Sequence, residues 1–154
     1  MKPGDQAPDF TLTDQDGTSR TLSDLLSDGP VVLFFYPAAM TAGCTAESCH
    51  FRDLATEFAE VGAQRVGISP DSVQRQNQFA TLNDFDYPLL SDGDGAVAAE
   101  FGVKRRFGPL PVKRHTFVID TDRTVIEVIK SEFAMNAHAD KALTALRERA
   151  KRGS

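Results

Sequence analysis

A buried strand meets the longest helical pattern of the chain in residues 31–49, which read VVLFFYPAAMTAGCTAESC. Residues 31–36 form an unbroken apolar run bounded by prolines, and its β-branched and aromatic content is typical of a strand buried on both faces. Such a strand predicts a parallel position at the centre of a sheet. From residue 44 to 61 the apolar side chains recur with the period of a helix.

The rest of the chain alternates strand and helix patterns. A hairpin is expected over residues 9–22, around the turn signal Asp16-Gly17. Further strands are predicted at 64–69, 87–90, 115–120 and 125–130, and further helices at 23–27, 70–83, 95–101 and 136–152. This order predicts an α/β layered fold, and the length suits a single domain over residues 1–154.

Composition narrows the class of protein. The formal net charge of −5 argues against nucleic acid or an anionic membrane as the main partner. No apolar run approaches the ~20 residues that span a bilayer, and the first residues lack the pattern of a signal peptide. We therefore expect a cytoplasmic protein, in which a cysteine pair is more often catalytic or metal-binding than a structural disulfide.

The only two cysteines are Cys44 and Cys49. Cys44 opens the helical pattern, where unpaired N–H groups and the helix dipole favour an anionic thiolate. It shares a stripe with Phe51 and Phe58, so its sulfur should point inward; burial disfavours the thiolate, and a reactive Cys44 therefore needs donors or a cation nearby. Cys49 falls on a polar face with Arg52.

The spacing of the pair has a geometric consequence. Residues five apart on an ideal helix are turned by about 140° and their Cα atoms lie roughly 8–9 Å apart, whereas disulfides rarely exceed ~7 Å. A disulfide between these cysteines would therefore require the first turns to unwind. From the residues alone, an inert buried cysteine, a zinc site or a thioredoxin-like reductase stay open, although no paired histidine spacing and no C-x-x-C are present.

The wider pattern resembles a known family. Pro37-x-x-x-Thr41-x-x-Cys44 is similar to the active-site signature of the peroxiredoxins, and a cysteine five residues later marks the peroxiredoxin Q, or bacterioferritin comigratory protein, branch. Similar context is found at residues 4–10, 51–53 and 114–120. The resemblance implies a thioredoxin-like fold, with a central mixed sheet flanked by helices and an N-terminal β-hairpin extension.

The resemblance also implies catalytic roles. Cys44 would be the peroxidatic nucleophile that becomes a sulfenic acid, and Cys49 the resolving thiol that forms an intramolecular disulfide with it. Arg114 would stabilise the thiolate and the charge on the leaving oxygen, because a guanidinium stays protonated and offers several donors. The alternative for Arg114 is a surface arginine at a strand start.

Three further positions complete the implied site. The backbone N–H groups of Gly43 and Cys44 would bind the peroxide. The Thr41 hydroxyl would contact both peroxide and thiolate, although it could instead cap the helix. Pro37 would shield the thiolate from water, or simply end the strand.

The function so implied is an atypical two-cysteine, thiol-dependent peroxidase that reduces hydrogen peroxide and organic hydroperoxides. A thioredoxin-type reductant would regenerate it, with no metal or organic cofactor, and a monomer is expected. Two rivals stay open: a thiol-disulfide oxidoreductase on the same fold, and a peroxide sensor that signals through its disulfide.

Some features fall outside the signature. Ala42 replaces a proline common in the family, and residues 38–40 are apolar where many relatives are charged, so the pocket mouth should be more apolar. Glu47 fits the first helical turn, where an acid complements the helix dipole. A basic patch formed by Lys104, Arg105, Arg106 and Lys113 is either a solvated loop or a docking surface for an acidic reductant.

Overall fold

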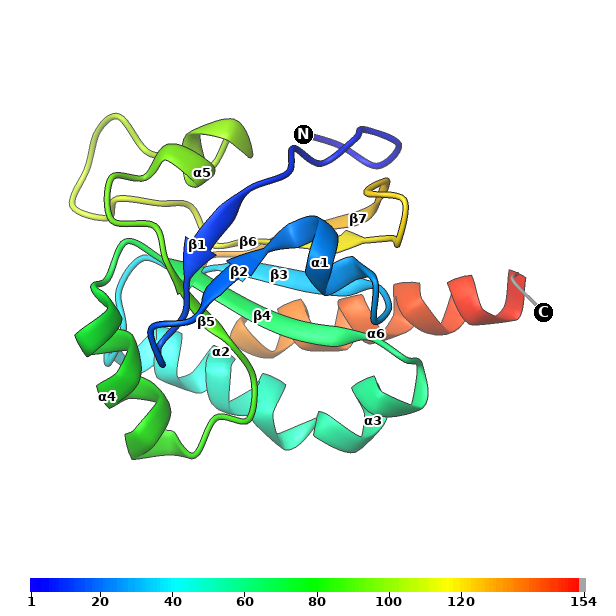
Figure 1. Ribbon diagram of the computed structural model, residues 1–154, viewed down its shortest axis with the longest axis horizontal. Helices are drawn as coiled ribbons and strands as arrows, with labels where there is room; N and C mark the ends of the chain where they lie inside the picture. The colour runs from blue at the N-terminus through cyan, green and yellow to red at the C-terminus, as the bar shows by residue number, and fades with distance from the viewer. Residues whose placement is uncertain (153–154) are drawn as a thin grey trace.

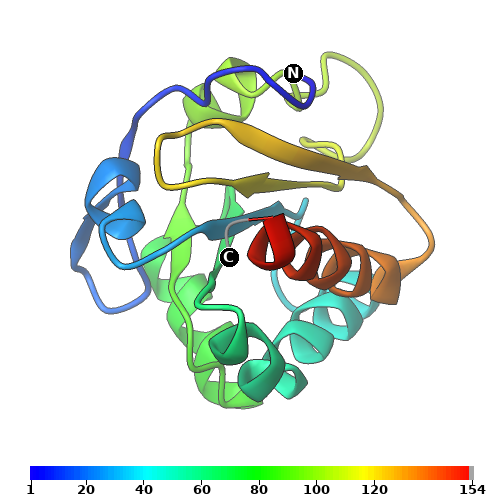
Figure 2. The same cartoon turned by 90° about the vertical axis from the view of Figure 1, so that its right-hand side faces the viewer.

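The computed structural model describes residues 1–152 and contains one mixed sheet with helices on both faces (Figures 1 and 2). The strands are β1 (Thr11–Thr13), β2 (Ser19–Thr21), β3 (Val31–Phe35), β4 (Gln64–Ser69), β5 (Leu89–Ser91), β6 (His115–Ile119) and β7 (Val125–Lys130). The helices are α1 (Leu22–Leu26), α2 (Ala42–Asp53), α3 (Ala55–Glu60), α4 (Val73–Asn83), α5 (Ala96–Glu100) and α6 (Met135–Arg152).

The sheet has the strand order β2-β1-β5-β4-β3-β6-β7. β3 pairs in parallel with β4, and β4 with β5, while β6 runs antiparallel to β3 and forms a hairpin with β7. The predicted central position of β3 is confirmed, but its parallel pairing holds on one side only. The N-terminal hairpin β1–β2 extends the sheet beyond β5 through the pair Thr13 and Ser91.

Alternate residues of β3 serve two separate cores, because successive side chains of a strand point to opposite faces. Leu33 and Phe35 pack on the face covered by α1 and α5. Phe34 packs on the face covered by α2, α3, α4 and α6, where its ring stacks on Phe51 with 4.2 Å between centroids. This stacking fixes α2 directly beneath the central strand, as Figure 1 shows.

The helix boundaries differ from the predicted ones, most of them by one to three residues. The helix expected over residues 44–61 begins at Ala42 and is broken at Leu54, whose φ of −96° and ψ of 21° separate α2 from α3. α4 begins after Ser72, whose hydroxyl accepts a hydrogen bond from Arg75 N at 3.2 Å, rather than at residue 70. α1 follows Thr21 rather than Ser23.

Within residues 1–152, no helix combines the length and the apolar character that a membrane crossing requires.

Candidate active site

The central feature of the site is a buried contact between a thiol and a guanidinium. Cys44 lies in the first turn of α2, fully buried, which confirms the inward orientation expected for its sulfur. Arg114 Nη2 lies 3.3 Å from Cys44 Sγ. The two residues meet because β6 runs antiparallel to β3: Thr116 pairs with Phe34, so Arg114, just before β6, reaches the carboxyl end of β3 where α2 begins.

The Arg114 guanidinium contacts two acidic groups, the Cys44 thiol and the Glu47 carboxyl. While Nη2 faces the thiol, Nη1 donates to Glu47 Oε1 at 3.0 Å. Burial opposes the charge on Arg114, but the neighbouring Glu47 and Cys44 outweigh it and raise the pKa of the guanidinium. Arg114 is therefore a permanent cation beside the sulfur. It meets the requirement that a buried reactive cysteine has a positive group nearby.

Glu47 is part of this site, a pocket role that the sequence left open as its lesser alternative. Its expected place in the first helical turn is wrong, because α2 begins at Ala42 and has no acid in its first turn. Its side chain is fully buried, and burial raises its pKa to about 8 because Arg114 offsets only part of the desolvation. Its second oxygen, Oε2, lies 3.4 Å from His138 Nε2 and has no hydrogen bond within the described residues. Glu47 and Cys44 thus both contact the same positive charge, that of Arg114.

His138 of α6 is a neutral neighbour of this cluster. Its Nε2 lies 2.7 Å from the carbonyl oxygen of Ser131, which can only accept, so Nε2 carries the proton. Its Nδ1 then accepts from the Thr116 hydroxyl at 2.7 Å. Burial lowers the pKa of His138. The ring therefore adds no second cation to balance Glu47.

The backbone around Cys44 provides further donors. The first hydrogen bond of α2 runs from Thr45 N to Thr41 O, so the N–H groups of Gly43 and Cys44 lie ahead of the intrahelical ladder. A Cβ atom at Gly43 would lie 3.4 Å from Arg114 Nη2 and 3.5 Å from Met135 Cε. These are ordinary van der Waals distances, so Arg114 and Met135 pack beside the start of α2 without requiring a glycine there.

Thr41 and Pro37 lie in the loop between β3 and α2. Thr41 is the N-cap of α2, but its hydroxyl donates to Ala38 O at 2.8 Å and caps no helical N–H. Its alternative role as a side-chain cap is therefore wrong. Pro37 is buried directly after β3. Met40, in the same loop, has a φ of 65°, which is uncommon for a residue with a side chain.

Charged residues at the start of α4 hold this loop. Asp71 accepts a hydrogen bond from Ala39 N at 2.7 Å and another from the Ser69 hydroxyl at 2.7 Å. Arg75 pairs with Asp71 at 3.1 Å and donates to Ala39 O at 3.4 Å. These bonds explain how the loop keeps the strained backbone at Met40.

Cys49 lies on another side of α2, in contact with the end of α4. Both cysteines are free thiols, and the helix is continuous through them. Cys49 is half-buried and its Sγ lies 3.6 Å from Asn83 Oδ1. The polar face expected around Cys49 therefore packs against α4, where Arg52 Nη1 donates to Asn83 O at 2.8 Å.

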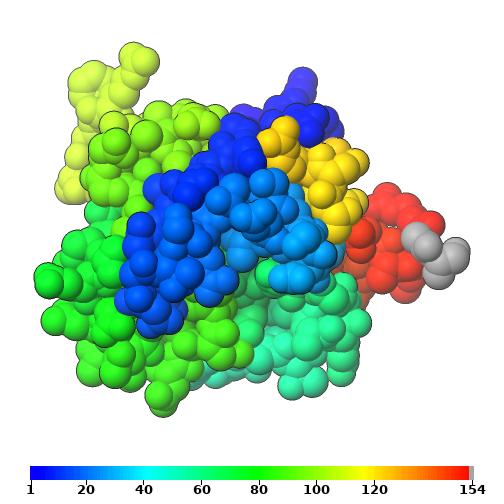
Figure 3. Space-filling view, viewed as in Figure 1, coloured from blue at the N-terminus to red at the C-terminus, as the bar shows by residue number. Residues whose placement is uncertain are grey.

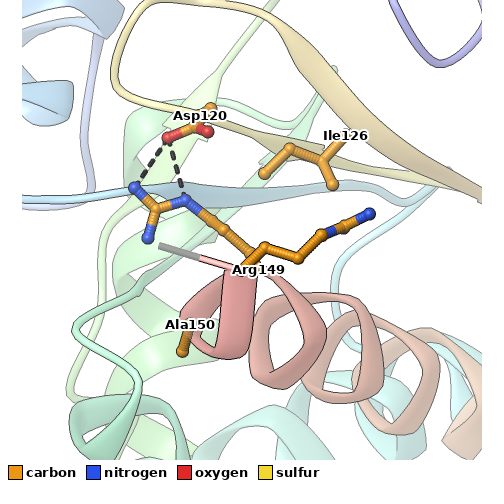
Figure 4. A pocket seen from close by; sticks show the side chains of 5 residues that line it. Asp120, Ile126, Arg149 and Ala150 are labelled. Carbon is orange, nitrogen blue, oxygen red and sulfur yellow. Dashed lines mark hydrogen bonds and ion pairs between the residues drawn. The ribbon is translucent and has the colours of Figure 1, made fainter. Parts of the chain in front are cut away.

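A separate hollow lies at the far end of α6, lined by Asp120, Ile126, Arg149, Ala150 and Arg152 (Figure 4). Arg149 donates to Asp120 there at 3.0 Å. Since Met135 at the start of α6 adjoins Gly43, fourteen helical residues, or about 21 Å, separate this hollow from the thiol. It is not the pocket of Cys44. No three His, Cys, Asp or Glu side chains within residues 1–152 gather as metal ligands would.

Comparison with known proteins agrees with this geometry. The model of the AhpC/TSA family matches residues 3–128. The crystal structure of the peroxidoxin BcpB from Mycobacterium tuberculosis is 70% identical, with 96% of this chain and 97% of that chain covered and a TM-score of 0.92. The chloroplastic peroxiredoxin Q of Sedum lineare is 41% identical over 144 residues, which are 93% of this chain and 76% of the relative.

A third relative connects the fold to peroxide chemistry. The bacterioferritin comigratory protein of Xanthomonas campestris, described in a structural study of its alkyl peroxide reduction activity, is 33% identical, with 92% of each chain covered and a TM-score of 0.83. These likenesses confirm the expected thioredoxin-like α/β fold and the expected resemblance. The chain therefore belongs to the AhpC/TSA family and is a peroxiredoxin.

Proposed function

We propose that Cys44 is the peroxidatic nucleophile of this peroxiredoxin, acting on hydrogen peroxide and organic hydroperoxides. One observation carries the assignment: the buried Cys44 sulfur lies 3.3 Å from the buried Arg114 guanidinium. The position of Cys44 in the first turn of α2 adds the favourable field of the helix dipole. Both features stabilise the thiolate, which is the nucleophilic form.

In the first step, the thiolate attacks one peroxide oxygen. The S–O bond forms while the O–O bond breaks, so the sulfur is oxidised to a sulfenic acid and the peroxide leaves as water or an alcohol once its oxygen takes a proton. Arg114 and the N–H groups of Gly43 and Cys44 stabilise the charge on the two oxygens. Pro37 keeps water from the sulfur, and the Thr41 hydroxyl, which donates to Ala38 O, can still accept from the peroxide.

In the second step, the Cys49 thiol attacks the Cys44 sulfenic acid, and water leaves as the disulfide forms. The continuous α2 helix holds the two sulfurs on different sides, so its first turns must unwind. Two contacts must then break: the pair between Glu47 and Arg114, and the 2.7 Å hydrogen bond from Tyr87 to Ser48 O.

The second half of α2 is held more firmly. Arg65 Nη1 donates to Phe51 O at 2.9 Å and also pairs with Asp86, so it ties α2 to β4. Phe51 itself is fully buried against Phe34. We therefore place the limit of unwinding between Cys49 and Phe51. A dithiol reductant of the thioredoxin type then restores both thiols by exchange.

We further propose that the single peroxiredoxin domain works in the cytoplasm as a monomer. A chain whose only two cysteines form the proposed redox pair suits a reducing compartment, and its net charge of −5 makes copies of the chain repel one another. Sedimentation of the reduced and the disulfide forms tests the monomer, because a concentration-dependent dimer in either form contradicts it.

The roles of the two cysteines are tested by comparing wild type, Cys44→Ser and Cys49→Ser under rapid mixing with hydrogen peroxide or an organic hydroperoxide. Sulfenic acid is trapped with a dimedone probe and measured by mass spectrometry. Cys44→Ser should lose the first oxidation, whereas Cys49→Ser should keep it and lose turnover with thioredoxin. Far-ultraviolet circular dichroism should show less helix in the disulfide form. A disulfide form with the helix content of the reduced protein would refute the unwinding.

Rapid oxidation of Cys44 combined with negligible turnover would instead indicate a peroxide sensor. A Cys44→Ser protein that still reduces protein disulfides would indicate a thiol-disulfide oxidoreductase.

A further inference from the structure

Apolar side chains are exposed beside the candidate active site. Phe107 is 88% exposed, Phe133 is 92% exposed and Leu110 is 41% exposed. Phe107 and Leu110 belong to the loop that leads into Arg114, and Phe133 belongs to the segment that leads into α6. Bulky apolar groups gathered at the surface of a soluble domain often mark an interaction site. We call residues 104–113 and 131–135 together the docking surface.

The docking surface is also cationic. Lys104, Arg105, Arg106 and Lys113 all lie in its first segment, although the chain as a whole carries a charge of −5. Lys104 donates to the carbonyl oxygen of Asp94, a neutral group. This basic, apolar surface attracts an acidic partner, whose charge is opposite to that of the surface.

The two segments form one unit that is joined to the catalytic arginine. Glu132 accepts hydrogen bonds from Arg105 Nη2 at 2.7 Å and from Arg114 N at 3.1 Å. Ser131 N donates to Arg114 O at 3.4 Å. The backbone of Arg114 thus lies between the segments, and its side chain reaches Cys44.

The docking surface adjoins the first turns of α2, which must unwind before the disulfide can form. Met135 Cε lies 3.5 Å from the place that a Cβ atom of Gly43 would occupy, so the end of the second segment contacts the first turn of α2. The first segment projects from the molecule, as the yellow-green loop of Figure 3 shows. This loop lies on the α5 side of the sheet, so within the docking surface it is the second segment that reaches the first turn of α2.

We propose that the docking surface binds the acidic protein dithiol that reduces the Cys44–Cys49 disulfide, an inference that rests on the proposed function. Charge decides between this partner and a second copy of the chain. A symmetric dimer would place the same cations opposite one another, which is unfavourable. An acidic partner with an apolar rim around its thiol would neutralise Arg106 and Lys113 and cover Phe107 and Phe133.

The bound partner performs an ordinary exchange. One of its thiolates attacks a sulfur of the Cys44–Cys49 disulfide, which breaks that bond and forms a mixed disulfide between the proteins. The partner's second thiol then attacks the mixed disulfide. Two electrons pass to this chain, both of its cysteines return to thiols, and the partner leaves with its own disulfide.

The test compares two reductants of the preformed disulfide. An acidic bacterial thioredoxin needs a docking surface, whereas dithiothreitol does not. Two double variants change the surface: Arg106→Glu with Lys113→Glu, and Phe107→Ala with Phe133→Ala. For each we expect kcat/KM with thioredoxin to fall at least tenfold. The rates with dithiothreitol and of Cys44 oxidation by peroxide should stay within about twofold of wild type.

Two control variants make the same kinds of change outside the docking surface. Arg147→Glu alters the charge of an exposed residue of α6, and Leu82→Ala removes an exposed apolar side chain of α4. Both should reduce with thioredoxin as the wild type does. Added salt should slow the wild type and affect the charge-reversed variant less.

Several results would overturn the proposal. Normal thioredoxin rates in both double variants would show that the surface is not used, and a loss in Leu82→Ala alone would move docking to α4. A wild-type dimer that the phenylalanine variant dissociates would assign the surface to self-association. By contrast, a wild type that forms no disulfide after peroxide would refute the proposed function itself, a separate result.

Discussion

Replacing Glu47 by glutamine tests how the site distributes one positive charge between two acids. The Arg114 guanidinium donates to Glu47 Oε1 at 3.0 Å and faces Cys44 Sγ at 3.3 Å, and all three groups are buried. Burial raises the pKa of Glu47 to about 8, so the buried carboxyl binds a proton more readily than an exposed glutamate does. Glutamine has the size and charge of that protonated form, and its oxygen can still accept from Arg114.

The sign and size of the effect follow from linkage. The unfolded chain releases the Glu47 proton near pH 4.5, whereas the folded protein keeps it until about pH 8. The stabilisation from this proton is therefore complete below pH 4.5 and is lost as the pH rises to 8. Each pH unit in that window costs roughly 1.4 kcal/mol. From pH 5 to 8 the wild type should lose on the order of 4 kcal/mol relative to Glu47→Gln, a large share of a typical domain's stability.

The assay is urea unfolding, followed by far-ultraviolet circular dichroism, at half-unit steps from pH 5 to 8. The difference between the wild-type and Glu47→Gln free energies cancels the titration of groups that Glu47 does not contact, such as His115. Glu148→Gln, a change at an exposed position of α6, serves as the control and should follow the wild type.

Parallel curves for wild type and Glu47→Gln would refute the reasoning, since they would mean that Glu47 binds the same number of protons folded and unfolded. If the wild type instead became more stable relative to Glu47→Gln as the pH rises, the direction of the Glu47 pKa shift on folding would be the opposite of the one expected. The ion pair with Arg114 would then outweigh burial, and folding would lower the pKa of Glu47.

Three other substitutions have expected outcomes. In Arg114→Lys a single ammonium cannot occupy both guanidinium positions, so loss of a charged hydrogen bond should slow peroxide oxidation of Cys44 about ten- to hundredfold, measured as a second-order rate constant. Phe51→Ala removes the fully buried ring stacked on β3 and should cost about 3–5 kcal/mol in urea unfolding. Tyr87→Phe removes the hydrogen bond to Ser48 O, worth about 1 kcal/mol, and should speed disulfide formation about fivefold in quenched-flow mass spectrometry; an unchanged rate would show that this bond persists during unwinding.

Much of the fold could be predicted from local patterns. The unbroken apolar run of β3 identified the central strand, because only a strand covered on both faces can be apolar throughout. The β1–β2 hairpin followed from the turn signal Asp16-Gly17. The break at Leu54 was not predicted, since the apolar period of α2 continues into α3 and carries no sign of the change in direction.

The features of the candidate site were likewise predicted only in part. The placement of Cys44 at the start of a helix, the glycine before it and the inward direction of its sulfur could all be read from neighbouring residues. Glu47 and His138 could not, because their contacts depend on partners far along the chain. Glu47 meets Arg114 across 67 residues, and His138 meets Thr116 across 22. The hydrogen bond from Ala39 N to Asp71 joins residues 32 apart in the sequence, and it was not predicted for the same reason.

By itself the sequence determined which thiol begins a helix, which one follows it, and that a disulfide between them is incompatible with an intact α2. These are consequences of helix geometry, which acts over a few residues. Only the tertiary structure decided the charge balance of the site. The antiparallel pairing of β6 with β3 brings Arg114 to Cys44, and burial then makes Glu47 and Cys44 compete for one guanidinium. Sheet register and desolvation are properties of the whole folded chain, so no local pattern contains them.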